Sequence, residues 1–500
     1  MENTNQNNYS RRFLARIVVE AATPLAVGSG EKDIRTDSLV ATDCNGLPYI
    51  PATSIAGVLR SMCVDKEAGD MLFGYQNGDS GHGSEIIFTE ARVIDSKGRV
   101  IDGINTSAIE SDPLLKHYQM LPVRQHVRLN GKGVAVDTGL FNEQVVYAGT
   151  RFCFEIEMVS DGSNFNRFEE VLRKISAVDF RLGGGTRKGF GKIRIVQEFT
   201  KWICLDLNNE DDLRLYLEKT SSLDDSFWDK SVSFHNLSKE TDTGEETDER
   251  NVDVYSLNLK PEGFFLFGSG FGDDDADMTP VKAKKVEWSE SADGRGRTEG
   301  CMKENLVLIP ASSLKGALEH RVAFYWNRNQ HVFADELTPE KLNELTDKRN
   351  AAVRVLFGYE EAAAKDGKSR VIMRGNVIFS DIIEGTVYDK ILNHVAIDRF
   401  TGGAIGGALF SEKASYGGSN DTDFRYETEI LIDNTGLKRA CKLEWGEDSS
   451  EKADELKSVF KAALDDLCKG MLSLGGGVNR GHGVFKGSYN VFEYKTHEGI

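Results

Sequence analysis

An internal duplication restricts the fold of this chain more than any other feature of its sequence. Six blocks occur twice among the 500 residues, in the same order in both halves. Three of the pairs are nearly identical: IPATSIAGVLR at 50–60 with IPASSLKGALE at 309–319, LFGY at 72–75 with LFGY at 356–359, and LGGGTRKGFG at 182–191 with LGGGVNRGHG at 474–483. Self-similarity of this kind predicts two diverged copies of one structural module.

The other three pairs define the extent of each copy. They are AVGSG at 26–30 with LFGSG at 266–270, EIIFTEARV at 85–93 with NVIFSDIIE at 376–384, and HVRLNGKGVAVDTGLF at 126–141 with HVAIDRFTGGAIGGALF at 394–410. We therefore predict a first domain at 1–205 and a second at 251–500. The stretch between them, 206–250, contains the acidic run TDTGEETDER and is predicted to be an exposed linker.

Both copies have the same predicted order of elements. A strand, a long loop, a helix and a strand precede a hairpin-like insert, which is followed by a strand, a second helix, a glycine-rich loop and a last strand. The first helix follows an Ile-Pro pair and is expected at 55–68 and 314–326; the second is expected around 168–175 and 456–467. Two strand–helix–strand units in series are typical of the split βαβ, or ferredoxin-like, fold. We therefore predict an α+β fold of two tandem ferredoxin-like domains.

Composition argues against several classes of protein. No apolar run approaches the ~18 residues of a membrane-spanning helix, so no membrane partner is expected. The seven cysteines are scattered without a CxxC pair, which argues against disulfides and zinc and favours the cytoplasm. A net charge of −18 counts only in part against a nucleic-acid binder, because much of the acid lies in runs that leave other segments locally basic.

The glycine-rich loops are the strongest candidates for contact with RNA. Glycines let a main chain approach a sugar–phosphate backbone closely, and cations neutralise the charge of that backbone. Neither loop fits the phosphate-binding pattern GxxxxGK[ST], so ATP hydrolysis is not indicated. The structural alternative is a helix end followed by a tight turn. The candidate RNA-binding residues of the two loops are Gly184, Gly185, Arg187, Lys188, Gly476, Gly477, Arg480 and His482.

Taken together, these motifs resemble a known family. The GSG strand end, the IPASSLKGALE helix, the IDRFTGGAIGGALF hairpin and the GGG loop are similar to those of the backbone subunits of type III CRISPR effector complexes, in the repeat-associated mysterious protein (RAMP) superfamily. The double module resembles the tandem backbone subunit of subtype III-D. The resemblance implies that the partners are guide CRISPR RNA, complementary target RNA, and other effector subunits, among them neighbouring backbone subunits and the large palm-domain subunit.

The resemblance also implies a division of labour within each copy. The glycine-rich loop and the helix after Ile-Pro would hold the guide, while the hairpins at 127–141 and 395–410 would be thumbs that push between the guide and target strands. Outside the glycine-rich loops, the predicted RNA-binding residues are Ser54, Arg60, Arg124, Arg128, Lys132, Ser312, Ser313, Lys315 and Arg399.

A nuclease site is implied in the loop after the first strand. In catalytic members of the family this loop presents an aspartate, and by position Asp37 matches it, with Asp33 as a second candidate. Such a carboxylate can hold Mg²⁺ or another divalent cation, with Asp37 as the metal ligand, or align a 2′-hydroxyl for attack. In the second copy a Thr-Pro-Val tripeptide places the aspartate position on Met278, so that Asp277 would serve after a one-residue shift in register.

The predicted function is a guide-RNA-binding subunit that also cleaves target RNA within the assembled complex. Three alternatives stay open. One is the same scaffold without cleavage, and another is a guide-processing ribonuclease that uses His126, His394 or His482. The third is a duplicated ferredoxin-like protein with a metabolic or regulatory role.

Overall fold

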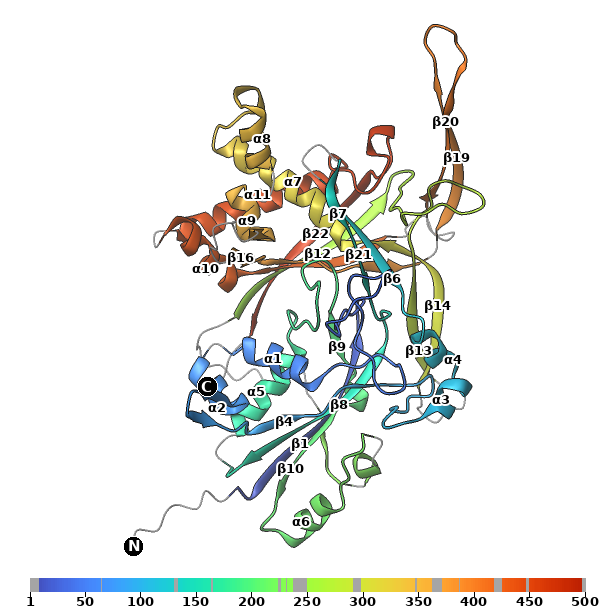
Figure 1. Ribbon diagram of the computed structural model, residues 1–500. Helices are drawn as coiled ribbons and strands as arrows, with labels where there is room; N and C mark the ends of the chain where they lie inside the picture. Colours follow the sequence, from blue (N-terminus) through green and yellow to red (C-terminus); the bar gives the residue numbers. More distant parts are fainter. Residues whose placement is uncertain are drawn as a thin grey trace.

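The first strand of the chain lies inside an antiparallel sheet (Figure 1). The computed structural model describes residues 9–496 except 64, 130–133, 163–164, 224–225, 231, 237–249, 291–297, 347–348, 362–370, 386, 418–424 and 447–448. Strand β1 (Arg11–Ala21) pairs with β8 (Arg151–Ser160) on one side and with β9 (Ile193–Ile195) on the other. Strand β4 (Ile86–Phe88) pairs with the far edge of β8 and completes the order β9-β1-β8-β4.

The second sheet repeats this order. Strand β12 (Arg250–Pro261) pairs with β21 (Tyr426–Asp433) and with β22 (Phe485–Thr496), and β17 (Val377–Ile378) lies outside β21. The order β22-β12-β21-β17 matches that of the first sheet strand for strand, because in both sheets the first strand lies between the third and the last. The duplicated α+β architecture that the sequence predicts is therefore present.

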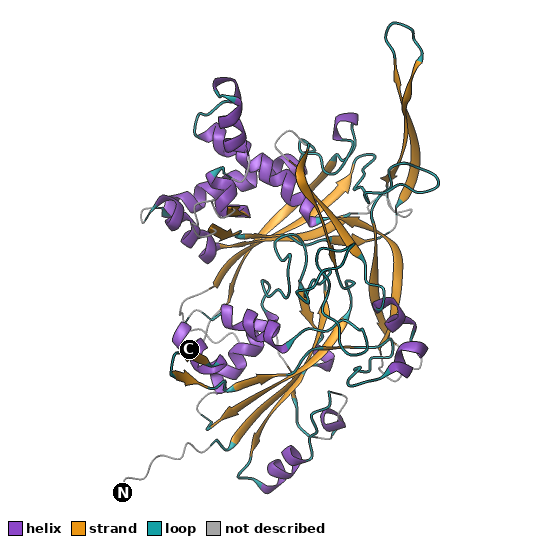
Figure 2. Cartoon of the chain, in the orientation of Figure 1, coloured by secondary structure: helices purple, strands orange, loops and turns teal. Residues whose placement is uncertain are grey.

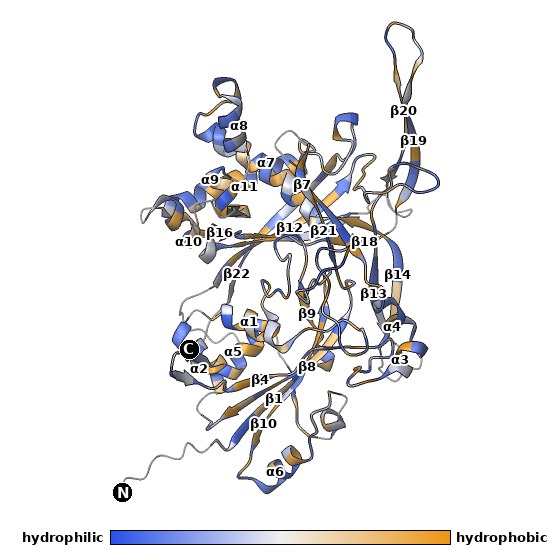
Figure 3. Ribbon diagram, in the orientation of Figure 1, coloured by the Kyte–Doolittle hydropathy of each residue, from blue (hydrophilic) through white to orange (hydrophobic). Residues whose placement is uncertain are grey.

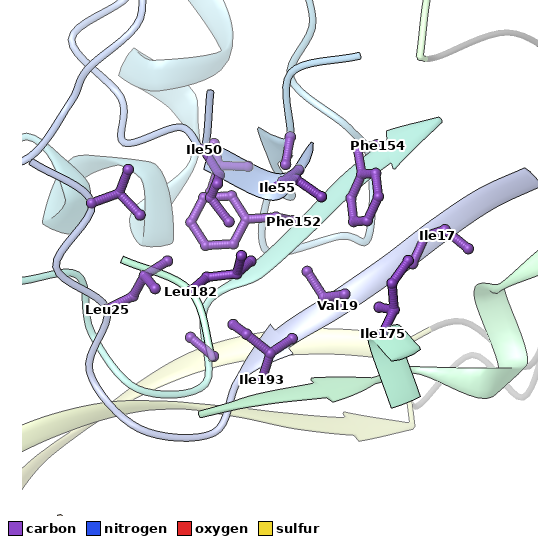
Figure 4. Packing of buried hydrophobic residues seen from close by; sticks show 14 of the residues in the cluster. Ile17, Val19, Leu25, Ile50, Ile55, Phe152, Phe154, Ile175, Leu182 and Ile193 are labelled. Atoms are coloured by element: carbon purple, nitrogen blue, oxygen red, sulfur yellow. The ribbon is translucent and has the colours of Figure 1, made fainter. Parts of the chain in front are cut away.

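Alternate residues of β1 bury one face of the first sheet under two helices. Ile17 and Val19 join a core with α1 (Ala52–Ser61) and α5 (Phe165–Ser176), as Figure 4 shows. This alternation follows from the pleat, which points successive side chains to opposite faces. The core also contains the four α5 residues whose helical spacing predicted the helix: Phe168, Val171, Leu172 and Ile175.

The second module carries a larger set of helices on one face of its sheet (Figure 2). Leu257 and Leu259 of β12 pack in one core with helices α7, α9, α10 and α11. These helices span Ala311–Asn329, Ala351–Phe357, Asn434–Trp445 and Ser450–Cys468. The first helix after Ile-Pro is thus nearly twice as long in the second copy as in the first.

Both predicted thumbs are antiparallel hairpins. The first consists of β6 (Val123–Leu129) and β7 (Ala135–Gln144), and the second of β19 (Tyr388–Ile397) and β20 (Ala404–Tyr416). Each has a register shift just after its histidine. The β19–β20 hairpin projects away from the body of the molecule (Figure 1).

The second module has an additional hairpin between its first strand and its Ile-Pro helix, and this arm holds the first module. Strands β13 (Lys282–Glu290) and β14 (Thr298–Ile309) form a long hairpin. Near its end, the Trp288 Nε1 group donates a hydrogen bond to the Gly149 carbonyl at 2.8 Å, and the Arg151 guanidinium lies 4.3 Å from the Trp288 ring centroid. The β13–β14 arm therefore joins the two modules.

Part of the predicted linker packs on the first module. Strand β10 (Lys201–Asp206) extends the first sheet by pairing with β1, and β11 (His235–Asn236) pairs with β10. Phe227 and Trp228 are buried against Leu14 and Leu205. The predicted domain boundary at 205 therefore falls inside a folded addition to the first module. Residues 237–249 of the predicted linker lie outside the described residues.

Short elements complete the fold, and most of them connect the parts described above. No described helix is long and apolar enough to cross a membrane. The remaining elements are α2 (Lys66–Phe73), β2 (Tyr75–Asn77), β3 (Ser80–His82), β5 (Arg92–Val93), α3 (Thr106–Ser111), α4 (Pro113–Tyr118), η1 (Gln197–Phe199), α6 (Glu210–Leu217), η2 (Ser226–Asp229), η3 (Ala334–Glu336), α8 (Pro339–Thr346), β15 (Gly358–Glu361), β16 (Val371–Arg374), β18 (Ile382–Glu384) and η4 (Val478–Arg480).

The arm generates a stability prediction. We expect Trp288→Ala to lower the free energy of unfolding by about 2–3 kcal/mol, since it removes packed aromatic area and a hydrogen bond. Urea unfolding followed by circular dichroism measures the change. The matched control is Lys284→Ala on the same arm, whose pair with Glu304 is exposed and worth no more than about 1 kcal/mol. Equal midpoints for the two variants would contradict the role of the arm.

Candidate nucleic-acid interface

The two glycine-rich loops have the same backbone geometry. Gly184 N–H donates to the Ala26 carbonyl at 2.6 Å, and Gly476 N–H donates to the Leu266 carbonyl at 2.7 Å. A Cβ atom on Gly183 would lie 2.5 Å from that Ala26 oxygen, so this glycine lets the loop pack against the end of the first strand. At these positions the glycines therefore have a structural role in the packing of the loop.

The glycine-rich loop of the first module docks on the second module. Gly189 lies so close to the start of α7 that an added Cβ would be 2.6 Å from the Ala311 Cβ. Arg187 Nε donates to the Gly375 carbonyl at 2.9 Å, and burial lowers the pKa of Arg187 to about 9. The loop of one module and the Ile-Pro helix of the other thus form one continuous surface.

Asp381 is the buried centre of this junction. Its Oδ1 accepts a hydrogen bond from the Ala311 N–H at 2.8 Å, and its Oδ2 lies 3.0 Å from Arg124 Nη2. Both charged side chains are largely buried, so burial raises the pKa of Asp381 and lowers the pKa of Arg124, while each partner opposes the shift of the other. One carboxylate therefore caps the second module's helix and anchors the first module's hairpin.

The Ile-Pro helices carry a glycine that the protein itself does not require. A Cβ on Gly57 in α1 or on Gly316 in α7 would meet no atom of the described residues within 4 Å apart from the backbone of its own helix. A glycine inside a helix costs roughly 0.5–1 kcal/mol relative to alanine. Two equivalent helices accept this cost on an open face, which fits the close approach of a ligand backbone to that face.

The predicted RNA-binding residues fall into two groups. Several contact other residues of the protein. These contacts are Arg124 and Arg187 at the junction, Arg60 with Asp70 and the Gly74 carbonyl, Lys315 with the Phe357 carbonyl, and Gly184 and Gly476 with the first strands. Lys188 contacts Phe141, and Arg480 and the buried His482 contact Glu412. Ser54, Ser312 and Ser313 are half-buried on the helices, and Arg128 and Arg399 are exposed on the hairpins. Gly185 and Gly477 have positive φ in their loops, and Lys132 lies outside the described residues.

The hairpins expose apolar side chains. On the second hairpin Phe400 at the turn is fully exposed, and Leu409 is 71% exposed. On the first hairpin Leu140, the equivalent of Leu409, is 70% exposed. Figure 3 shows both hydrophobic and hydrophilic residues along β19 and β20. An apolar set on a projecting hairpin indicates a surface that a partner covers, and the faces of nucleic-acid bases are one such partner.

The aspartate loops of the two copies contain the same hydrogen-bonded turn. Asp33 Oδ1 accepts hydrogen bonds from the N–H groups two and three residues later, and Asp273 Oδ1 does the same. The position equivalent to Asp37 is therefore Asp277, and the register that placed it on Met278 is wrong. The Thr-Pro-Val tripeptide predicted the wrong alignment of the two loops, because the hydrogen-bonded turn that precedes it sets the equivalence of the residues.

Asp37 and Asp277 are both held by the base of a hairpin. Asn142 N–H donates to Asp37 Oδ2 at 2.9 Å, and Asp37 N–H donates to Asn142 Oδ1 at 2.9 Å. In the second copy the Ser411 N–H donates to Asp277 Oδ2 at 2.7 Å, and the Ser411 hydroxyl donates to the same oxygen at 3.0 Å. These two bonds lower the pKa of Asp277. Asp37 and Asp277 thus anchor their loops as well as presenting a carboxylate at the surface.

A second repeated cluster lies on the opposite side of the same strands. His126 stacks on Phe141 with ring centroids 4.8 Å apart, and His126 Nε2 lies 3.0 Å from Glu143 Oε1. Lys188 Nζ lies 4.6 Å from the centroid of the Phe141 ring. The equivalent contacts of the second copy join His394, Phe410, Glu412 and Arg480. Lys188 and Arg480, the cations of the two loops, are therefore equivalent.

Glu412 is the most buried member of these clusters. Its carboxylate accepts from Arg480 at 2.6 Å and lies 3.5 Å from the nitrogen of the buried His482. Burial raises the pKa of Glu412, but hydrogen bonds from Arg480 and His394 outweigh burial and leave that pKa below its usual value. Sequence reasoning missed Glu143 and Glu412 because the repeated hairpin block was ended at Phe141 and Phe410, although the triplets FNE and FSE extend the match.

The donor chemistry near Asp37 fits a divalent cation only in part. Among the described residues no group of three His, Cys, Asp or Glu side chains is placed to hold a metal ion. Mg²⁺ in nucleic-acid enzymes is commonly bound by one or two carboxylates together with phosphate oxygens and water. Asp37 could supply one such carboxylate, and the remaining ligands would have to come from RNA and solvent.

The junction generates a second stability prediction. Asp381→Asn keeps an oxygen to accept from Ala311 N–H but leaves the buried Arg124 unpaired, so we expect a loss of about 3 kcal/mol in unfolding free energy. The matched control is Glu429→Gln, which breaks the more exposed Lys192–Glu429 pair between the modules and should cost no more than about 1 kcal/mol. Urea unfolding of both variants tests this; an Asp381→Asn protein as stable as the control would contradict it.

Comparison with known proteins supports the duplication. A family model described as the RAMP superfamily matches residues 18–194 and 303–486, so one match falls in each module. No curated protein matches the chain. The two matches cover most of the chain and include both glycine-rich loops and both hairpins. The chain therefore belongs to the RAMP superfamily.

Proposed function

We propose that this chain is the guide-RNA-binding backbone subunit of a type III CRISPR effector complex, of the tandem kind that resembles subtype III-D. Superfamily membership points to a CRISPR-associated RNA-binding subunit. The proposed partners are guide CRISPR RNA, complementary target RNA, neighbouring backbone subunits and the large palm-domain subunit. We also propose that each module is ferredoxin-like, which the common order β9-β1-β8-β4 and β22-β12-β21-β17 supports.

The observation that carries RNA binding is the open glycine face beside a cation-bearing loop. Gly316 in α7 leaves its helix surface free for close approach, and the adjoining loop of the first module bears Lys188. A polyanionic backbone needs both close approach and positive charge. The hairpins, with Phe400 at one turn, fit thumbs that insert between the paired strands.

The proposed cleavage rests on the equivalence of Asp37 and Asp277. Both carboxylates occupy the same position at the base of a hairpin that would separate the strands at a fixed interval. A carboxylate there can accept a proton from a 2′-hydroxyl or orient it toward the adjacent phosphate. A divalent cation bound by Asp37 and phosphate oxygens would supply charge stabilisation of that phosphate.

The RNA-binding proposal predicts effects of opposite sign on stability and affinity. Gly316→Ala should raise the unfolding free energy by roughly 0.5–1 kcal/mol, because alanine is the better helix former and its Cβ meets open space. The same methyl group should weaken guide-RNA binding, because it occupies the space that the RNA backbone needs. Thermal unfolding and filter binding at one fixed salt concentration measure the two effects.

A control is Leu217→Ala, an exposed side chain on α6 in the folded addition to the first module, which Figure 1 shows at the opposite end of the molecule from α7. It should leave affinity for RNA unchanged. Equal affinities of wild type and Gly316→Ala would show that RNA does not approach this helix face.

The cleavage proposal is tested with Asp37→Asn in the assembled complex. Asparagine keeps an oxygen for the Asn142 N–H and so preserves the loop, but removes the charge. We expect target cleavage at the corresponding position to fall by about a hundredfold or more, with guide content unchanged. Asp277→Asn should remove the second cut in the same way, and chelation of divalent cations should remove both.

Unchanged cleavage by the double Asp37→Asn, Asp277→Asn variant would favour a scaffold without nuclease activity. A guide-processing role would instead show as trimming of precursor RNA by the isolated chain, lost on substitution of His126 or His394. Both histidines pair with carboxylates at the hairpin base, which gives them a structural explanation.

A further inference from the structure

One three-residue segment of each hairpin contacts two different loops of its module. The segments are Phe141–Glu143 in β7 and Phe410–Glu412 in β20. Because successive side chains of a strand point to opposite faces, the middle residue faces one loop and its neighbours face the other. The aspartate loop lies on the side of Asn142 and Ser411, and the glycine-rich loop lies on the side of Glu143 and Glu412.

On the aspartate side, the middle side chain fixes the main chain of the loop. Asn142 Oδ1 accepts from Asp37 N–H at 2.9 Å, and Asn142 Nδ2 donates to the Arg35 carbonyl at 2.7 Å. Ser411 Oγ accepts from Asp277 N–H at 3.1 Å and donates to Asp277 Oδ2 at 3.0 Å. A backbone bond from the same residue to the aspartate carboxylate is present in both copies.

On the glycine-loop side, the same segment holds the loop's cation. Phe141 stacks under Lys188, and Phe410 lies under Arg480, whose guanidinium also pairs with Glu412. The side chains differ between the copies, with Asn for Ser and Lys for Arg, but both copies keep the hydrogen bonds between the middle residue and its aspartate and the cation over the phenylalanine ring. Two diverged modules thus retain one geometry that ties the aspartate loop, the hairpin and the glycine-rich loop together.

We propose that Asn142 and Ser411 are positioning residues, which fix Asp37 and Asp277 relative to the glycine-rich loop through the hairpin base. This inference rests on the proposed cleavage by these aspartates. Neither residue reacts with RNA; each sets the distance between the carboxylate and a strand held by the neighbouring loop. A small displacement of a catalytic group is enough to slow a reaction strongly.

The test uses complexes that carry Asp277→Asn, so that only the first module cuts. In this background Asn142→Ala should lower the single-turnover cleavage rate at saturating target by about ten- to a hundredfold, without changing target affinity, guide content or the melting temperature of the complex. Asn142→Ser should restore most of the rate, because serine holds the equivalent aspartate of the second module.

The cleavage rates and affinities of these variants distinguish a positioning role from a general structural role. A rate for Asn142→Ala equal to that of the parent overturns the positioning role, and so does a serine variant that is as slow as the alanine variant. Loss of guide RNA or target affinity along with the rate would show a general structural role and also overturn it. Failure of the underlying function is distinguishable, because then Asp37→Asn itself, in the same background, would leave the cut intact.

Discussion

The buried carboxylate of Asp381 is the contact on which the arrangement of the two modules depends. It caps the start of α7 in one module and pairs with Arg124 from the hairpin of the other. A buried charge is costly unless it is fully paired, so this contact strongly favours one relative placement of the modules. That placement brings the first glycine-rich loop against the Ile-Pro helix of the second module and makes a continuous surface from two chain segments far apart in sequence.

The two modules have equivalent loops, but the contacts that join the modules are not repeated. The glycine-rich loops, the aspartate loops and the hairpin bases keep equivalent hydrogen bonds in both modules. The junction does not repeat: where the first module has Arg124 and Arg187, the second has Leu392 and Asn479. The β13–β14 arm likewise belongs to the second module alone and holds the first through Trp288. Elements that bear the proposed chemistry are thus retained, while elements that join the modules have diverged.

Local patterns in the sequence predicted the repeated modules, the principal helices and both hairpins. The helical spacing of apolar residues in α5 predicts its buried face directly, because that pattern depends only on neighbours along the chain. The junction could not be predicted in this way. Arg124 and Arg187 look like cations available to RNA, and only their distance to Asp381 and Gly375 assigns them to the interior. The Asn142 and Ser411 contacts also depend on a pairing of segments more than 100 residues apart.

In the proposed function both modules hold RNA at equivalent places. The most direct measurement is ultraviolet cross-linking of the native complex to its RNA, followed by mass spectrometry of the cross-linked peptides. Equivalent RNA-binding surfaces in the two modules would give cross-links in pairs, to the peptides of α1 and α7 and to those that carry Lys188 and Arg480. A complex that contains no RNA, or cross-links confined to one module or to surfaces away from these elements, would contradict the proposed function.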